Sequence, residues 1–151
     1  MSGMPHLDTC VLSKYLDPRA RERFPQLVVK VEGVIAAGGL RISRLVVYQI
    51  MRGIELLRKR GEGEKKFARV ELFLRGAITY ELDGYSPEVW RTAIELWTEG
   101  RRRGVNGDPE DLLILATAMG NKSVLMTADV PLARRAERLG VADSVELLPL
   151  A

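Results

Sequence analysis

Short apolar runs alternate along this chain with longer segments in which apolar residues recur every three or four positions. The short runs have the length of buried strands, about four to eight residues. The longer segments have the spacing of a helix with one face in the core. The runs predict strands over residues 7–11, 40–43, 77–82, 123–127 and 144–148, and Asp8 interrupts the first of them.

Helices are predicted between these strands. They begin after Pro25, Ser43, Ser86 and Asp108, and two more run through residues 67–74 and 131–139. Because a helix between two strands allows a parallel crossover, this order predicts an α/β fold, a three-layer α/β/α sandwich with a central, mostly parallel sheet. No repeat or linker divides the chain, so we expect a single domain over residues 1–151.

The spacing also predicts which helix faces are buried. In the helix after Ser43 the expected core positions are Val47, Ile50, Met51, Ile54 and Leu57. In the helix after Ser86 they are Trp90, Ala93, Ile94 and Trp97. The helix after Asp108 is apolar nearly all round over residues 112–116, so it should be largely buried.

The composition fits one globular domain. The 151 residues are 46% hydrophobic and 28% charged, which is ordinary for a folded protein. No apolar run approaches the roughly 20 residues of a membrane helix and no secretory signal is visible, so no membrane partner is expected. The single cysteine, Cys10, cannot form an internal disulfide, which fits a reducing cytoplasm.

The charged residues favour a nucleic-acid partner only weakly. The net charge is +3, well short of a dedicated basic stripe. Basic clusters at residues 58–60, 65–66 and 101–103 are typical of solvated helix ends. The single histidine, His6, excludes a ribonuclease site with two histidines and a histidine-rich zinc site.

Three carboxylates stand where apolar residues would be expected. Asp8 and Asp129 each come at the end of a predicted strand, so parallel strands would bring both to one edge of the sheet. Asp111 lies in the first turn of the helix that should be buried, where a carboxylate is costly unless it is hydrogen-bonded or bound to a metal. Together they would form an oxygen-rich site for a hard divalent cation.

Each of these acids also has a structural interpretation. Asp108 precedes Pro109 and is better explained as a helix cap than as a ligand. Asp129 fits a cap and a ligand equally well. Asp8 is harder to explain structurally, because an acid inside a short apolar strand has few uses there. The hydroxyls of Thr9 and Thr127 could orient the acids nearby or be ordinary strand residues.

Four segments, in this order, match a known family. They are Leu7-Asp8-Thr9, the Ser43–Gly53 segment that contains Gln49, residues 111–118 and residues 125–129. This set resembles PIN-domain ribonucleases, especially VapC-type toxins. The resemblance implies endonucleolytic cleavage of RNA with Mg²⁺ or Mn²⁺, a homodimer and a small antitoxin partner. It implies catalytic positions at Asp8, Gln49, Asp111 and Asp129, with the three aspartates as metal ligands.

Gln49 departs from the family pattern, which has a glutamate there. An amide offers an oxygen but no negative charge, and it cannot act as a base. Glu55, on the same predicted helix, lies about 240° further round and is a poor substitute. Two hypotheses follow: a metal-dependent endoribonuclease, or a catalytically impaired binding or regulatory module with the same fold. Arg44 and Arg52 are candidates for steering RNA phosphates, although both could be ordinary solvated arginines.

Other α/β classes fit less well. A receiver domain needs adjacent acids near the first strand and a lysine after the last, and a haloacid-dehalogenase-type phosphatase needs Asp-x-Asp. Here Asp8 is followed by Thr9 and Cys10, and no Walker-type glycine-rich loop is present. Cys10 is a poor candidate for a nucleophile, since His6 is its sole potential base.

Overall fold

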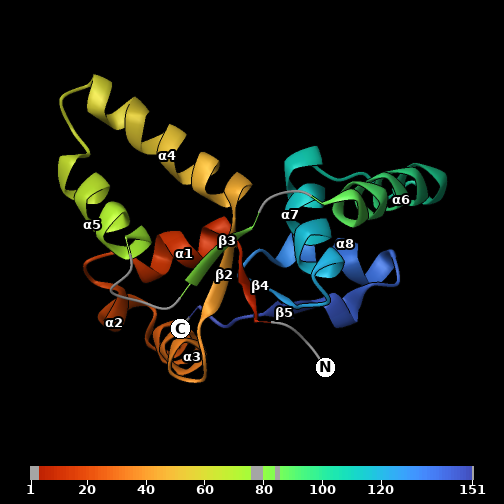
Figure 1. Ribbon diagram of the computed structural model, residues 1–151, viewed down its shortest axis with the longest axis horizontal. Coiled ribbons are helices and arrows are strands. Elements are labelled where there is room, and N and C mark those ends of the chain that lie inside the picture. Colours follow the sequence, from red (N-terminus) through yellow and green to blue (C-terminus); the bar gives the residue numbers. More distant parts are fainter. Residues whose placement is uncertain (1–3, 76–79, 84–85, 151) are drawn as a thin grey trace.

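The fold is a parallel sheet covered by helices, in a computed structural model that describes residues 4–75, 80–83 and 86–150 (Figure 1). The strands are β1 (His6–Leu7), β2 (Leu40–Ser43), β3 (Tyr80–Asp83), β4 (Leu125–Thr127) and β5 (Val145–Leu147). Their order is β3-β2-β1-β4-β5, and every pairing is parallel. The predicted fold class is therefore confirmed.

Helices cover both faces of the sheet. They are α1 (Thr9–Tyr15), α2 (Ala20–Arg23), α3 (Pro25–Ala36), α4 (Arg44–Lys59), α5 (Glu64–Leu74), α6 (Pro87–Arg103), α7 (Pro109–Gly120) and α8 (Val130–Arg138), followed by the 3-10 turn η1 (Ala142–Ser144). In Figure 1, α4 and α5 lie to one side of the sheet, with α6, α7 and α8 to the other. No helix among the described residues is long and apolar enough to cross a membrane.

The first strand is shorter than predicted, and a helix takes its place. β1 ends at Leu7, and α1 begins two residues later at Thr9. Asp8 is the N-cap of α1, so the acid marks a helix start and not the interior of a strand. Of the strand predicted over residues 77–82, residues 77–79 lie outside the described residues, and β3 begins at Tyr80.

The core lies on the sheet and on α7. Strand residues Leu7, Ile42 and Met126 are fully buried. As predicted, α7 is largely buried, with Leu112, Ile114, Leu115, Ala116, Thr117 and Ala118 inside. On α4 the buried residues are Val46, Ile50 and Ile54. The predicted Val47, Met51 and Leu57 are half-buried, so the core stripe of α4 is turned towards Val46.

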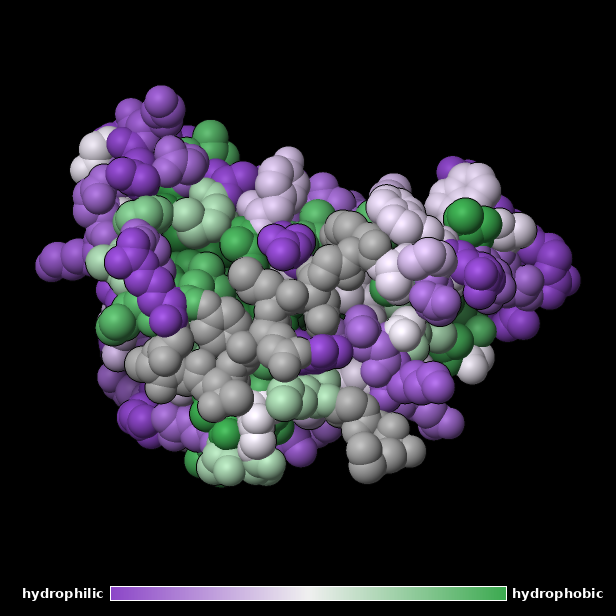
Figure 2. Space-filling view, in the orientation of Figure 1, coloured by the Kyte–Doolittle hydropathy of each residue, from purple (hydrophilic) through white to green (hydrophobic). Residues whose placement is uncertain are grey.

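The predicted core face of α6 is wrong for three of its four residues, whereas the fourth, Ala93, is partly buried and packs against the core. Trp90, Ile94 and Trp97 are exposed by 49%, 64% and 47%, and the residues that α6 buries are Val89, Leu96 and Gly100. The reason is close packing: a Cβ added to Gly120 of α7 would lie 2.8 Å from Cγ2 of Val89. A contact this tight has no room for tryptophan side chains. Apolar side chains accordingly reach the surface at the α6 end of the molecule (Figure 2).

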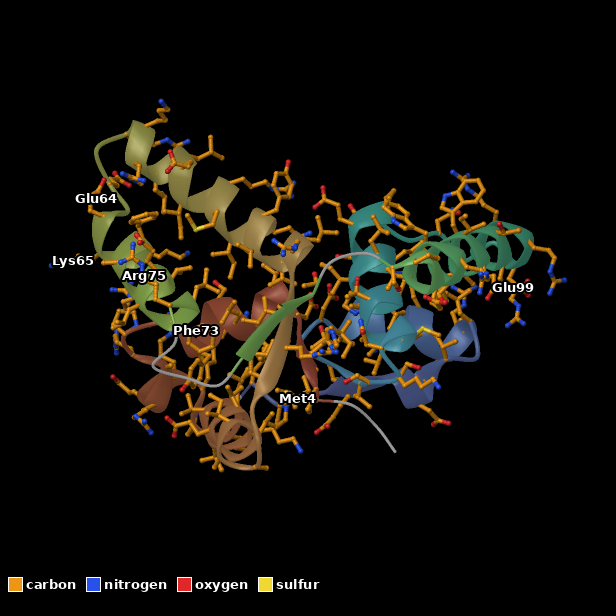
Figure 3. The ribbon with its side chains drawn as sticks, viewed as in Figure 1. Met4, Glu64, Lys65, Phe73, Arg75 and Glu99 are labelled. Carbon is orange, nitrogen blue, oxygen red and sulfur yellow. The ribbon has the colours of Figure 1, made fainter. Side chains whose placement is uncertain are left out.

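The opposite end is closed by α5. Phe73 of α5 packs edge-on against Tyr15 of α1, with ring centroids 6.0 Å apart, and Figure 3 shows it at the end of α5 nearest the sheet. α5 begins at Glu64, three residues before the predicted start, because Gly63 takes a left-handed conformation and ends the preceding turn.

Candidate active site

The carboxyl ends of three neighbouring strands carry polar residues that cap helices. Asp8 follows β1 and caps α1, Ser43 ends β2 and caps α4, and Asp129 follows β4 and caps α8. Because the strands are parallel, these three helix N-termini share one edge of the sheet. The positive ends of the helix dipoles favour negative charge at this edge. The cap interpretation of Asp129 is thus correct, and it leaves one carboxylate oxygen free of the cap.

Asp8 is held rigidly at the centre of this edge. Its side chain is buried, Oδ1 accepts a hydrogen bond from the amide of Thr9 at 2.8 Å, and Oδ2 accepts one from the hydroxyl of Thr127 at 2.6 Å. Thr127 in turn accepts a hydrogen bond from the amide of Asp129 at 3.0 Å. Thr127 therefore orients Asp8, and one hydroxyl links the two aspartates that follow β1 and β4.

Cys10 lies beside this pair but is not activated. Burial raises the pKa of the Cys10 thiol, and the negative charge of Asp8 raises it further. A thiol is a nucleophile in its ionised form. The structure therefore agrees with the weak case for Cys10 as a nucleophile.

Asp111 reaches the same cluster from α7. Its side chain is 26% exposed, and its pKa is raised to about 6, first by burial and then by the charges of Asp8, Asp108 and Asp129. Arg135 of α8 opposes this rise, with Nη2 3.4 Å from Oδ2 of Asp111. The charges of Asp8 and Asp129 are therefore close enough to repel that of Asp111. Their repulsion disfavours the ionised form of Asp111.

Asp108 is a cap, as its position before Pro109 indicates. Its Oδ1 accepts hydrogen bonds from the amides of Glu110 and Asp111, at 2.8 Å and 3.4 Å. It still contributes to the site, because its charge is one of those that raise the pKa of Asp111.

Gln49 of α4 forms hydrogen bonds with α1 and with α7. Its Oε1 accepts a hydrogen bond from the hydroxyl of Thr9, and its Nε2 donates one to Oε1 of Glu110 at 2.7 Å. Glu110 also pairs through Oε2 with Nη1 of Arg52 at 3.0 Å. These two contacts, with that of Gln49 the larger, lower the pKa of the Glu110 carboxyl.

Glu110 is the residue that the sequence reasoning missed. It follows Pro109 in the first turn of α7, where an acid is usual and is explained by the helix dipole alone. Only the packing of α4 against α7 brings it to Gln49, 61 positions earlier in the chain. The signal in the sequence that could have drawn attention to Glu110 is its place between two other acids, Asp108 and Asp111.

The two arginines proposed as phosphate contacts lie on the surface of α4. Arg44 is its first residue and is exposed. Arg52 is also exposed, pairs with Glu110, and lies with its guanidinium carbon 4.9 Å from the centroid of the Tyr48 ring. Part of the Arg52 charge is thus neutralised by Glu110.

The oxygen donors at this edge of the sheet are of the kind that a hard divalent cation prefers. Within residues 4–75, 80–83 and 86–150, no three His, Cys, Asp or Glu side chains are already arranged to hold a metal ion. Asp8 and Asp129 each give an oxygen to a helix cap. Mg²⁺, however, commonly binds through one or two carboxylates and several waters. The raised pKa of Asp111 shows that a positive charge here would relieve an existing repulsion.

Comparison with known proteins points to one family. The PIN domain family matches residues 6–138. None of the curated protein sequences matches the chain. The fold is similar to that of a chain in VapBC2 of Rickettsia felis bound to a DNA fragment from its promoter, with a TM-score of 0.77, 19% identity, and coverage of 96% of this chain and 98% of that chain.

Two further solved structures are similar over nearly the whole length. DNA-bound VapBC from Salmonella typhimurium gives a TM-score of 0.75 at 20% identity, covering 97% of this chain and 98% of that one. VapBC-1 from nontypeable Haemophilus influenzae gives 0.70 at 16% identity, covering 95% and 96%. At such low identity the similarity establishes the fold alone.

Proposed function

The chain belongs to the PIN-domain family, and from this premise we propose that it is a metal-dependent endoribonuclease, a VapC-like toxin that hydrolyses RNA phosphodiester bonds. The observation that carries the proposal is the convergence of Asp8, Asp111 and Asp129, which come from three separate parts of the chain. Thr127 links Asp8 to Asp129 by hydrogen bonds, and the charges of both aspartates, after burial, contribute to raising the pKa of Asp111 to about 6. Acids are collected at such a cost to stability chiefly where function needs them.

The proposed metal ligands are Asp8, Asp111 and Asp129, with Mg²⁺ or Mn²⁺ as the ion. When bound, such an ion supplies Lewis-acid polarisation of a phosphate and lowers the pKa of water. Thr127 and the amide of Thr9 fix the orientation of Asp8. The N-termini of α1, α4 and α8 favour the negative charge of a phosphate at this edge.

The partners form part of the same proposal. RNA is the proposed substrate, with Arg44 and Arg52 on α4 as its phosphate contacts. A small antitoxin is the proposed protein partner, which is supported by the VapBC complexes among the similar structures. A homodimer and a cytoplasmic location complete the proposal; the single cysteine, Cys10, is compatible with a reducing compartment.

One observation favours a second function. Gln49 is neutral where the family has a glutamate, so the chain could bind RNA or a partner without cleaving it. Gln49→Glu discriminates between the two functions. A large gain in cleavage would identify the chain as catalytically impaired, whereas an active native chain with no gain supports the endoribonuclease.

The direct test is cleavage of labelled RNA at increasing Mg²⁺ or Mn²⁺ by the native chain and by Asp8→Asn and Asp111→Asn. We expect metal-dependent cleavage that falls by at least about 100-fold in both variants. Asp143→Asn, which changes an exposed aspartate in η1, is the matched control and should cleave like the native chain. Equal cleavage by the Asp8 variant and the native chain would rule out this site as its source.

A further inference from the structure

We infer that Tyr48 and Trp97 are stacking platforms for bases of an RNA strand, on either side of the start of α7, each backed by an arginine. The inference rests on the proposed function for its partner, RNA, but it concerns residues outside the group of aspartates. Its basis is an arrangement that occurs twice. An exposed aromatic side chain is followed one helical turn later by an arginine, Arg52 or Arg101, whose guanidinium carbon lies 4.9 Å from the ring centroid.

The exposure of the two rings sets them apart. Tyr48 is 55% exposed and Trp97 is 47% exposed. The other rings that lie against a cation within the described part of the chain, those of Phe24 and Phe67, are half-buried. With an arginine over one face and about half of the residue exposed, the other face can accept a base. Any base can stack on such a face, because every base has a π-face of its own.

The Tyr48 platform lies where α4 meets the start of α7. Tyr48 directly precedes Gln49, whose side chain bonds to Thr9 and to Glu110. Arg52 is fixed at the same contact, because its Nη1 lies 3.0 Å from Oε2 of Glu110. The ring of Tyr48 is therefore held beside the proposed active site by contacts on both sides of it in the helix.

The Trp97 platform approaches the same helix from α6. Trp97 and Arg101 line a small hollow of about 40 Å³ together with Gly107, which comes just before α7. A Cβ placed on Gly107 would lie 3.6 Å from Nε of Arg135, and Nη2 of Arg135 lies 3.4 Å from Oδ2 of Asp111. The side chain of Arg135 thus connects the wall of the hollow to Asp111. In Figure 1, α7 lies between α4 and α6, so the two platforms flank its start.

The charge of the α6 platform complements a phosphate. The neighbouring Arg102 and Arg103 both pair with Glu99. No carboxylate among the described side chains pairs with Arg101, which lies over Trp97 instead. An arginine in this position keeps its charge and can donate hydrogen bonds to phosphate oxygens. A ring beside such an arginine therefore fits a partner that has both flat bases and negative charge.

The competing explanation is that a protein, a second copy of the chain included, covers the exposed face of α6. Trp90 separates the two explanations. It is 49% exposed on the same helix, but its neighbour Val89 packs on Gly120, at the end of α7 opposite the aspartates. A protein on this face would use Trp90 and Ile94 as much as Trp97. Base stacking beside the aspartates would use Trp97 and not Trp90.

The test measures the affinity for a labelled single-stranded RNA of about 20 nucleotides by fluorescence anisotropy, in EDTA so that metal-dependent cleavage does not interfere. Leucine keeps an apolar side chain and a good helix propensity but has no aromatic face. We expect Tyr48→Leu and Trp97→Leu each to weaken binding about fivefold or more, and Tyr48→Phe and Trp97→Phe less than about twofold. Trp90→Leu is the matched control, with an expected change below about twofold. Thermal unfolding verifies that each variant is folded.

Each platform is tested by its own leucine variant, and binding like that of the native chain overturns that platform. A loss in Trp90→Leu as large as that in Trp97→Leu assigns the α6 face to a protein partner and overturns the Trp97 platform. Sedimentation of Trp97→Leu as a monomer, beside a dimeric native chain, has the same meaning.

The outcomes also separate this inference from the proposed function. If the native chain cleaves RNA with Mn²⁺ while both leucine variants bind RNA normally, the inference is overturned and the proposed function stands. If both platforms are confirmed but the native chain does not cleave, the endoribonuclease is wrong and the stacking platforms stand. A native chain that binds no RNA overturns the inference.

Discussion

Helices α6 and α7 both begin with a capping residue followed by proline and glutamate, yet their third helical positions act in opposite ways. The two starts read Ser86-Pro87-Glu88-Val89 and Asp108-Pro109-Glu110-Asp111. In both, the first residue caps the helix: Ser86 accepts from the amide of Val89 at 3.4 Å and Asp108 from that of Glu110 at 2.8 Å. Val89 is then fully buried against Gly120, whereas Asp111 is partly buried among other acids.

This difference shows that the packing partners of a helix, and not its local sequence pattern, decide what its third position does. On α6 the third position closes a tight contact between two helices and stabilises the fold. On α7 it brings a charge into a cluster of like charges, which costs stability in the absence of a cation. A position that opposes folding in this way is typical of a functional site.

The largest expected effect comes from making the two helices alike. Val89→Asp would bury a carboxylate that has no cation or capping role at the α6–α7 contact. We expect the free energy of unfolding to fall by about 3–5 kcal/mol, as for other unpaired buried charges. Denaturant unfolding measures this, with Glu88→Gln as a control expected to change it by less than about 0.5 kcal/mol. A loss below about 1 kcal/mol would mean that this contact tolerates charge.

Removing the charge of Asp111 on α7 should stabilise the fold. The folded pKa of Asp111 is about 6, above the unfolded value near 4, so the folded state binds its proton more tightly. Stability from this group is complete below about pH 4 and is lost as the pH rises to about 6. Asp111→Asn should therefore raise the unfolding free energy at pH 8 without metal, by about 1–2 kcal/mol after allowance for solvent exposure.

This gain should depend on pH. Urea unfolding of the native chain and of Asp111→Asn at pH 8 and at pH 3.5 gives the comparison, and the difference should disappear at the lower pH. A variant that is less stable than the native chain at pH 8 would show that the Arg135 contact outweighs the repulsion.

The smallest effect concerns the two caps. Ser86→Ala should lower the unfolding free energy by about 1 kcal/mol, the usual value of an N-cap. Asp108→Ala removes a cap as well, but it also removes a charge that repels Asp111. Its loss should be smaller, about 0.5 kcal/mol at pH 8, as measured by thermal unfolding. Equal losses would indicate that the charge of Asp108 does not act on Asp111.

The sequence was most informative where local and tertiary preferences agree. The strand over Leu40–Ser43 and the buried helix after Asp108 were predictable, because each apolar run has a single way to be buried. The start of α1 was not, since β1 has only two residues and Asp8 ends it. The face of α6 was predicted wrongly because its largest apolar residues are outside, and its contact with α7 requires small ones. Near the far end of α6, Glu99 forms surface ion pairs with Arg102 and Arg103 (Figure 3).

The site also contains residues that the sequence could reveal and one that it could not. Asp8, Asp111 and Asp129 could be picked out because each is an acid in an apolar context, and the structure places the charges of Asp8 and Asp129 within range of Asp111. Their joint role as ligands stays a prediction. Glu110 could not be found, because an acid in a first helical turn is ordinary and its significance depends on the contact with Gln49.

The central claim, that three aspartates share one cation, is tested most directly by thermal unfolding of the folded protein at increasing Mn²⁺. Binding to the folded state alone raises the unfolding temperature with ligand concentration. The account predicts a clear rise for the native chain and little or none for Asp8→Asn, Asp111→Asn and Asp129→Asn. An equal rise in the native chain and all three variants would contradict it.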